Sequence, residues 1–371
     1  MTIFVTFYLS VIFFLSGLAI RYGDRISFYM MLIFPFFLYL HSFLKKEKVF
    51  FPKKLTLVWF GFSFFDLLST IFSLNHQVSI ERFILYQSAY LIGIYFYNHQ
   101  EKYRSVIEKI IIFFGIIYTF AYIFKDSLLS LIRVINVNQA YNLFFPIFEN
   151  RNSHLGVWLG LVILIFIIKK KLTPLIFFLP FFLISYSRTA YISLFISYLF
   201  LTFLNNNFFK SKKILFWSTL ILLLMVFIFT VYLFVPRGSF LSNHHFYILE
   251  ALLGFKDRPF FGYGPGNFVS ISRIYAVQFS RTFGETSHNL FTDVLSESGL
   301  LSFLAFSMFF YSIFKNRSRN SEYYYLLIYF LAVFIFSYIH SMKMVFLLFM
   351  IIVSLAYKER EALKLKRISM G

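Results

Sequence analysis

Cysteine does not occur in this chain of 371 residues, so neither disulfide bonds nor thiolate metal sites can form. Charged residues are also scarce. They make up 14% of the chain, whereas a soluble domain is about a quarter charged. Acidic residues are the rarest, with 16 Asp and Glu against 35 Lys and Arg. This composition excludes an ordinary soluble domain.

The chain is instead rich in apolar residues, which make up 59% of it, and aromatic residues alone reach 23%. Apolar runs of roughly 17–25 residues, the length that crosses a bilayer as a helix, recur along most of it. The runs are continuous and lack the alternation of an outer-membrane barrel. We therefore predict an all-α polytopic membrane protein, with residues 1–371 forming a single integral membrane domain.

About twelve transmembrane helices are expected. They lie near 3–20, 26–44, 55–74, 80–97, 106–124, 154–168, 172–187, 189–204, 212–235, 289–314, 323–340 and 342–357. The longest segments between them are 125–153 and 236–288. The first includes "LLSLIRVINVNQAYNLFF", whose amphipathic pattern favours a position along the membrane surface.

Basic residues divide unequally between alternate loops. The richer side holds mostly lysine and is cytoplasmic by the positive-inside rule, which also places both termini and the C-terminal tail in the cytoplasm. The other side holds mostly arginine: Arg21, Arg25, Arg82, Arg133, Arg151, Arg188, Arg237, Arg258, Arg273 and Arg281. Arginine binds phosphate or carboxylate through paired hydrogen bonds, so an anionic ligand on this side is one interpretation. Contact with lipid headgroups is the other.

The segment 236–288 contains "RPFFGYGPGNF" at 258–268. Gly262, Gly264 and Gly266 alternate around Pro265, which predicts a tight turn. The spacing differs from phosphate-binding fingerprints, because no strand precedes the glycines.

The stretch "TSHNLFTDVLSESGL" follows. Asn289 is a favourable helix N-cap, and Asp293 falls in the first turn, where a negative charge complements the helix dipole. His288 then lies just before the helix, where an imidazole suits general-base chemistry, although an interfacial histidine without a role fits the position as well. Glu297 is a costly carboxylate inside an apolar helix, which indicates a functional or paired role with a partner that the sequence does not name.

Upstream, "SYSRTAYISL" places Arg188 at a junction between two helices with almost no loop. A snorkelling arginine and an anion-binding arginine both fit this position. No metal site is expected, because the eight histidines are scattered and no metal-ligand spacing occurs in an external loop.

The sequence resembles the O-antigen ligase and polymerase superfamily of bacterial inner-membrane proteins. Three motifs in this order carry the resemblance: "SRTA", "RPFFGYGPGNF" and "SHNLFTDVLSESGLLSFLAF". The resemblance is specific over 236–314 and weaker over 150–235. It implies a glycosyltransferase-C-like arrangement of twelve helices with a large periplasmic loop between the ninth and tenth, and this loop, 236–288, would carry part of the active site.

The resemblance also implies metal-independent, inverting glycosyl transfer without a cofactor. The donor is a glycan on undecaprenyl diphosphate. The acceptor is a sugar hydroxyl of lipid A–core oligosaccharide in a ligase, or another lipid-linked repeat unit in a polymerase. We favour the ligase. A transporter of lipid-linked oligosaccharide is the alternative from another class, although the two halves of the chain do not resemble each other as transporter repeats do.

By the same resemblance, His288 is the base and Arg188 holds the diphosphate, with Asn289, Glu297 and the three glycines in supporting positions. The family often has a further arginine about fifteen residues before the loop proline. Here that position falls on His244. Either His244 or His245 replaces the arginine, or Arg237 reaches in. A permanent cation favours Arg237.

Overall fold

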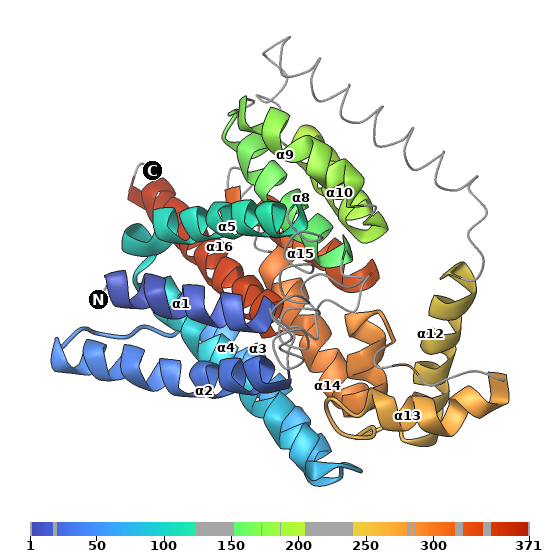
Figure 1. The fold of residues 1–371 in the computed structure, drawn as a ribbon. Helices are drawn as coiled ribbons and strands as arrows, with labels where there is room; N and C mark the ends of the chain where they lie inside the picture. The colour runs from blue at the N-terminus through green and yellow to red at the C-terminus, as the bar shows by residue number, and fades with distance from the viewer. Residues whose placement is uncertain are drawn as a thin grey trace. The chain divides into compact units, whose positions relative to one another are not determined.

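The computed structural model describes residues 2–17, 21–123, 152–171, 173–185, 187–204, 240–279, 284, 287–315, 322–336 and 343–369. All regular secondary structure in these residues is helical, which confirms the predicted all-α class (Figure 1). The predicted helix 212–235, the amphipathic stretch within 125–153 and Arg237 lie outside the described residues.

Each predicted helix that falls within the described residues is present. These helices are α1 (Thr2–Gly17), α2 (Arg21–Leu44), α3 (Lys53–Ile71), α4 (His76–Asn98), α5 (Gln100–Ile123), α8 (Asn152–Ile168), α9 (Thr173–Ile184), α10 (Arg188–Leu204), α14 (Leu290–Lys315), α15 (Glu322–Phe336) and α16 (Lys343–Ser369). Helix α16 continues past the predicted end at residue 357, through the charged tail that the hydropathy pattern had excluded.

Two helices in this part of the chain, α3 and α14, are long and apolar enough to cross a membrane, and several shorter helices are strongly apolar. Many large apolar side chains on these helices are exposed, among them Phe60, Leu57 and Ile176. Exposed apolar surface on this scale suits a lipid environment and would be costly in water. The helices thus have membrane-like character, while the count of twelve spans stays a prediction.

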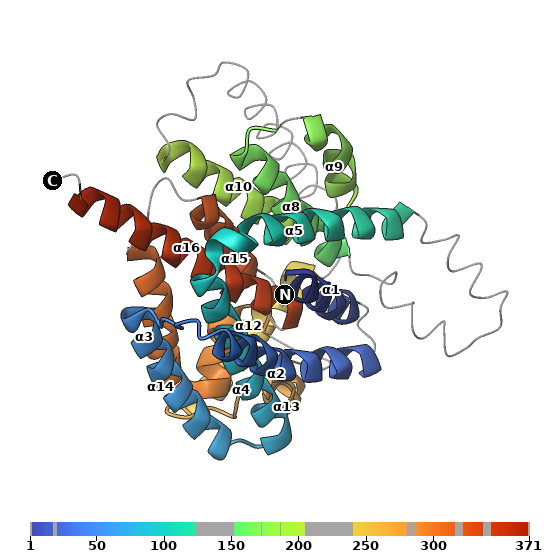
Figure 2. The ribbon, with the colours of Figure 1, turned by 90° about the vertical axis from the view of Figure 1, so that its left-hand side faces the viewer.

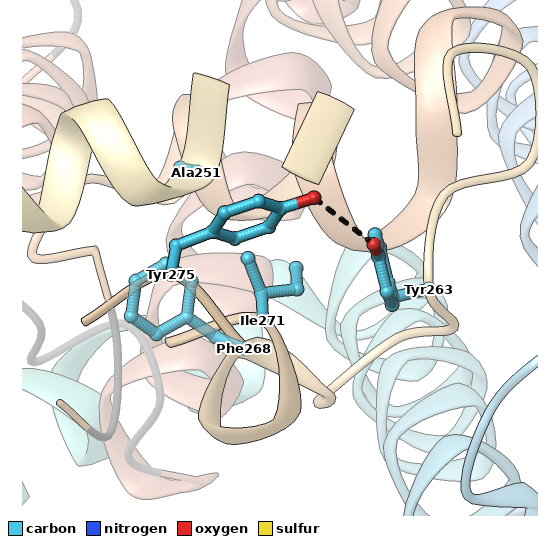
Figure 3. Packing of buried hydrophobic residues seen from close by; sticks show 5 residues of the cluster. All are labelled: Ala251, Tyr263, Phe268, Ile271 and Tyr275. Carbon is cyan, nitrogen blue, oxygen red and sulfur yellow. Dashed lines mark hydrogen bonds between the residues drawn. The ribbon is translucent and has the colours of Figure 1, made fainter. Parts of the chain in front are cut away.

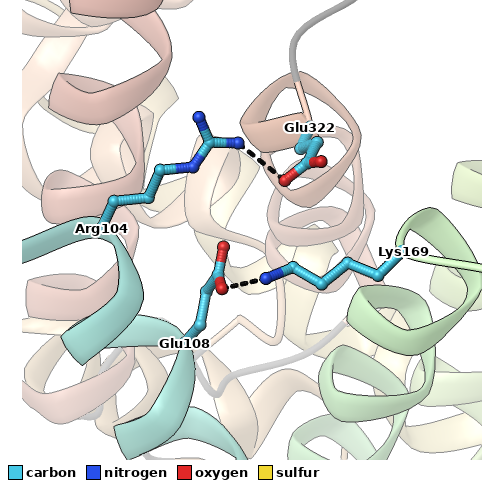
Figure 4. Close-up of polar contacts among 4 residues, drawn as sticks. All are labelled: Arg104, Glu108, Lys169 and Glu322. Atoms are coloured by element: carbon cyan, nitrogen blue, oxygen red, sulfur yellow. Dashed lines mark hydrogen bonds and ion pairs between the residues drawn. The ribbon is translucent and has the colours of Figure 1, made fainter. Parts of the chain in front are cut away.

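The chain forms two compact units. The first comprises residues 1–30, 99–235 and 319–333. Its helices α8 and α15 pack closely, because Gly160 leaves room for Tyr329, whose hydroxyl donates to the Val157 carbonyl at 2.7 Å. Two ion pairs also join its helices: Arg104 to Glu322, with N–O at 2.8 Å, and Lys169 to Glu108 (Figure 4).

The second unit comprises residues 31–98, 236–318 and 334–371. Helix α3 runs beside α14, and α4 packs on α16 (Figure 2). Aromatic rings fill the space between them. Trp59 stacks on Tyr90 with ring centroids 4.9 Å apart, and the ring of Phe62 packs on that of Phe306 with centroids 5.0 Å apart.

The segment 236–288 contains helices that the sequence did not indicate: α12 (Phe240–Asp257), α13 (Phe268–Tyr275) and a 3₁₀ turn at Ala276–Phe279. Polar residues interrupt the apolar pattern of these helices, so hydropathy does not predict them as spans. They share a small core of Ala251, Tyr263, Phe268, Ile271 and Tyr275, shown in Figure 3. The described part of this segment is therefore folded around a small core.

Candidate functional site at the start of helix α14

Helix α14 was predicted to be continuous but is broken at Gly299, where φ is 78° and ψ is 179°. Glycine reaches this conformation without the steric cost of a Cβ atom. A Cβ there would also lie 2.2 Å from the Phe260 carbonyl oxygen, so the loop backbone occupies the space that a side chain would need. The break leaves backbone groups of α14 without their helical partners.

The turn formed by "RPFFGYGPGNF" supplies those partners. The amides of Tyr263 and Gly264 donate to the carbonyls of Ser296 and Glu297 at 3.2 and 2.7 Å. In the other direction, the Leu300 amide donates to the Pro259 carbonyl at 2.8 Å. The loop therefore docks directly into the broken helix, with its backbone bonds satisfied.

The glycines permit the loop backbone to approach α14 closely. Their conformation also confirms the predicted tight turn. Gly262, Gly264 and Gly266 all have positive φ, at 64°, 98° and 79°. A Cβ on Gly262 would lie 2.3 Å from the Glu297 carbonyl oxygen, and one on Gly264 would lie 2.1 Å from Ser73 Cβ. At both positions a side chain would force the loop away from the residues that it contacts, Glu297 of α14 and Ser73 between α3 and α4.

Glu297 has partners that the sequence could not name. Its two carboxylate oxygens accept hydrogen bonds from the backbone amides of Gly266 and Phe268, each at 2.8 Å. Phe268 is the first residue of α13, so the carboxylate lies at the N-terminus of that helix, where its charge is favoured. Within the second unit, Glu297 thus connects the broken helix to the loop.

Arg82 belongs to the same cluster, although the sequence identified it only as one of the external arginines. Its Nε lies 3.5 Å from where a Cβ on Gly266 would be. It interacts electrostatically with the carboxylates of Glu297 and Asp66. Asp66 in turn accepts a 2.7 Å hydrogen bond from the Ser298 hydroxyl beside the break. No sequence spacing connects these residues, because they meet only through the packing of α3, α4 and α14.

The N-terminus of α14 confirms the predicted cap. The side-chain oxygen of Asn289 accepts hydrogen bonds from the amides of Phe291 and Thr292 at 2.9 and 3.2 Å. Asp293 lies in the first turn, and its Oδ1 accepts the Ser287 amide at 2.8 Å. Residues on both sides of His288 are therefore held by side-chain bonds.

His288 itself has φ of 61°, in the left-handed region. Histidine visits this region more readily than most residues, yet such positions often mark functional sites. The side chain is half-buried, and its ring stacks on Tyr247 of α12, with centroids 5.3 Å apart and planes 24° from parallel. The capped helix and the stacked ring together define where the imidazole lies.

The α9–α10 junction has the almost loop-free geometry that was predicted for Arg188. Ser185 and Ser187 are buried there, and the Ser187 hydroxyl accepts the Ala190 amide at 3.4 Å. Gly156 of α8 packs directly against this turn. A side chain at 156 would not fit, since its Cβ would lie 2.2 Å from Ser187 Cβ. Arg188 is the first residue of α10, and its side chain lies outside the described residues.

The candidate residues thus divide between the units. His288, Asn289, Glu297 and the three loop glycines belong to the second, and Arg188 to the first. His244 and His245 lie on α12, but their side chains lie outside the described residues, and Arg237 is wholly outside them. In the part of the chain that the structure describes, no three His, Asp or Glu side chains are grouped as a metal would require.

Residues 173–307 match the family model described as O-antigen ligase, while no curated protein matches the chain. The matched region runs from α9 to the second half of α14. It includes Arg188, the docked glycine turn and His288, all of which carried the resemblance in the sequence. Residues 173–307 therefore carry an O-antigen ligase family match, which supports the resemblance to the O-antigen ligase and polymerase superfamily.

Proposed function

We propose that this protein is an O-antigen ligase that transfers a glycan from undecaprenyl diphosphate to a sugar hydroxyl of lipid A–core oligosaccharide. The observation that carries the proposal is the match of residues 173–307 to the O-antigen ligase family model, which indicates ligase- or polymerase-type glycan transfer. That region holds both proposed catalytic features, the histidine before α14 and the arginine that begins α10.

In the proposed mechanism His288 accepts the proton of the acceptor hydroxyl. The hydroxyl oxygen then attacks the anomeric carbon of the donor sugar, and the bond from that carbon to the diphosphate oxygen breaks. Attack from the face opposite the leaving group inverts the anomeric centre. A sugar hydroxyl is a weak nucleophile, and a positioned base accelerates such a step by about 10²–10⁴-fold.

The leaving diphosphate gathers negative charge as its bond breaks. We propose that Arg188 neutralises it, with Arg237, or His244 and His245, as a second contact. Arginine stays charged and offers two parallel hydrogen bonds, so it stabilises a diphosphate in a partly dehydrated site without a metal ion. The arginines predicted for the external loops fit this requirement.

The proposed setting follows the membrane topology that the basic residues indicate. We place the protein in the bacterial inner membrane as one integral domain with both termini in the cytoplasm. The loop 236–288 and the active site then face the periplasm, where lipid-linked glycans are presented. The docking of this loop into α14 supports an active-site role, since it brings the loop against the helix that His288 precedes.

The glycan profile of a deletion strain tests the ligase assignment. Loss of a ligase leaves long O-chains on the lipid carrier, with none attached to core. Loss of a polymerase leaves single repeat units attached to core, and that result would reassign the activity within the superfamily. Accumulation of lipid-linked glycan on the cytoplasmic side alone would instead indicate transport. Complementation with the intact gene is the control.

Replacement of Arg188 by lysine is expected to reduce transfer by about 10- to 100-fold. A point charge loses one of two charge-assisted hydrogen bonds, each worth about 1.5–3 kcal/mol. The rate of transfer by purified protein measures this. Arg104→Lys is the matched control, because Arg104 pairs with Glu322 in the same unit. Equal activity of Arg188→Lys and wild type would exclude a bidentate role.

Chelation is expected to leave the transfer rate unchanged, because the proposed charge neutralisation uses arginine side chains. The purified protein is assayed before and after treatment with EDTA. Magnesium is then restored in a parallel sample as the control. A large loss that magnesium reverses would contradict the proposed metal-independent mechanism.

A further inference from the structure

Helix α12 presents one continuous face to its neighbours within the second unit. Tyr247, Glu250, Ala251 and Gly254 recur at the three- and four-residue spacing of a helix face. Ala251 and Gly254 pack toward α13, where a Cβ on Gly254 would lie 2.7 Å from the Ile271 side chain. This packing fixes the rotation of α12, and therefore the direction of Tyr247.

Glu250 extends this contact through hydrogen bonds. It is fully buried, and its Oε2 accepts the Ser272 hydroxyl at 2.5 Å. The Ser272 oxygen in turn accepts the Gly284 amide at 2.7 Å. Two helices of the loop thus hold Gly284 in position, four residues before His288.

Gly284 lies directly against Tyr247. A Cβ on Gly284 would lie 2.4 Å from Cε1 of the tyrosine ring, closer than atoms can approach. Only glycine leaves the ring where it is. The same ring stacks on the imidazole of His288 at 5.3 Å. The loop core, Gly284, Tyr247 and His288 therefore form a connected series of contacts.

We propose that Tyr247 is a positioning residue that holds the imidazole of His288 in the orientation from which it accepts the acceptor proton. Gly284, held by Ser272 and Glu250, keeps the tyrosine ring in place. The inference rests on the proposed role of His288 as base. Aromatic stacking acts through the faces of the two rings, so it restricts rotation of the imidazole and orients it.

The test compares Tyr247→Ala with Tyr247→Phe in purified protein. The donor is undecaprenyl-diphosphate-linked O-antigen, and the acceptor is lipid A–core from a strain that lacks O-antigen. We expect Tyr247→Ala to lower kcat by about tenfold or more, because a misoriented base slows the chemical step and leaves substrate binding unchanged. The KM for the donor should stay within about twofold, because the ring is not assigned to donor binding. Tyr247→Phe should restore kcat, since a phenyl ring stacks equally well.

Phe246→Ala is the matched control. Phe246 is the adjacent aromatic residue on α12, and its ring packs on Phe279 at 5.1 Å. Its removal should leave kcat unchanged. Wild-type kcat in Tyr247→Ala overturns the proposal, and so does a Tyr247→Phe variant as impaired as Tyr247→Ala, because the hydroxyl and not the stack would then matter.

Gly284→Ala provides a second, independent measurement. Its Cβ must displace the Tyr247 ring, so kcat should fall as in Tyr247→Ala. In the double variant with Tyr247→Ala the methyl group has room, and no further loss is expected. Fully multiplicative losses would contradict the proposed contact.

His288→Ala separates this inference from the proposed function. If His288→Ala is inactive and Tyr247→Ala is normal, only the positioning role fails. If His288→Ala is active, the catalytic role itself fails. In the His288→Ala background, Tyr247→Ala should cause no further loss, because the base that it orients is absent.

Discussion

Replacement of His288 by alanine is expected to lower the rate of glycan transfer by about 10²–10⁴-fold, the usual contribution of a positioned general base. The amount of protein in the membrane should stay the same, because the capping bonds of α14 come from Asn289, Ser287 and Asp293. The measurements are the transfer rate of purified protein and the ladder of O-chain lengths on lipopolysaccharide in cells.

The left-handed backbone of His288 requires a second variant. Alanine is strained at φ of 61°, whereas asparagine tolerates this region and also lacks a base of suitable pKa. His288→Asn should therefore be as inactive as His288→Ala but at least as stable. Added imidazole should restore part of the activity of His288→Ala by entering the vacated space.

His99→Ala serves as the matched control, since His99 lies between α4 and α5 beside Tyr103. It should retain full activity. Normal ladders in both His288 variants would exclude the base assignment. Inactivity of His288→Ala with normal activity of His288→Asn would indicate that backbone strain, and not the lost imidazole, explains the defect.

Features that depend on local sequence could be predicted. Continuous apolar runs gave the helices, because a helix satisfies its own backbone hydrogen bonds in lipid. Asn289 was identified as a cap since its side chain acts on amides two and three residues away. The alternating glycines predicted a tight turn because glycine adopts positive φ without steric cost, and their φ values confirm it.

Features that depend on contacts between distant segments could not be predicted. Gly299 within an apolar run is compatible with a straight helix, and only the docked loop explains the break. Arg82 and Asp66 are more than two hundred residues from the α14 break, so no spacing connects them to Glu297. Tyr247 was missed because a tyrosine in a chain with 26 of them carries no signal by itself.

The resemblance supplied what local physics left open at His288. Position alone fitted a bystander as well as a base. The structure adds a left-handed backbone, a capped helix and a stacked ring at that residue. These features constrain where the imidazole lies, and its role as the base remains the proposal that the variants above test.

Replacement of Glu297 by alanine is expected to destabilise the second unit by about 3 kcal/mol or more, because two charge-assisted hydrogen bonds of about 1.5–3 kcal/mol each are lost. The amides of Gly266 and Phe268 would be left without their acceptor beneath the loop. A fall in melting temperature of about 5 °C or more should accompany this loss in the detergent-purified protein. Limited proteolysis should cut the loop 258–268 faster.

Glutamine separates the charge of Glu297 from its shape. Its one carbonyl oxygen can accept from either Gly266 or Phe268, but its amide group then faces the other N–H, and two donors cannot pair. We therefore expect Glu297→Gln to lie between wild type and Glu297→Ala. Glu81→Gln on α4 is the matched control, because its carboxylate is exposed and should not affect stability. If Glu297→Gln had the melting temperature of wild type while Glu297→Ala did not, one hydrogen bond from the side chain at 297 would be sufficient alongside the backbone bonds of the loop. If both variants had the melting temperature of wild type, the backbone bonds of Tyr263, Gly264 and Leu300 would be sufficient to dock the loop. Glu297 would then have to be assigned another role.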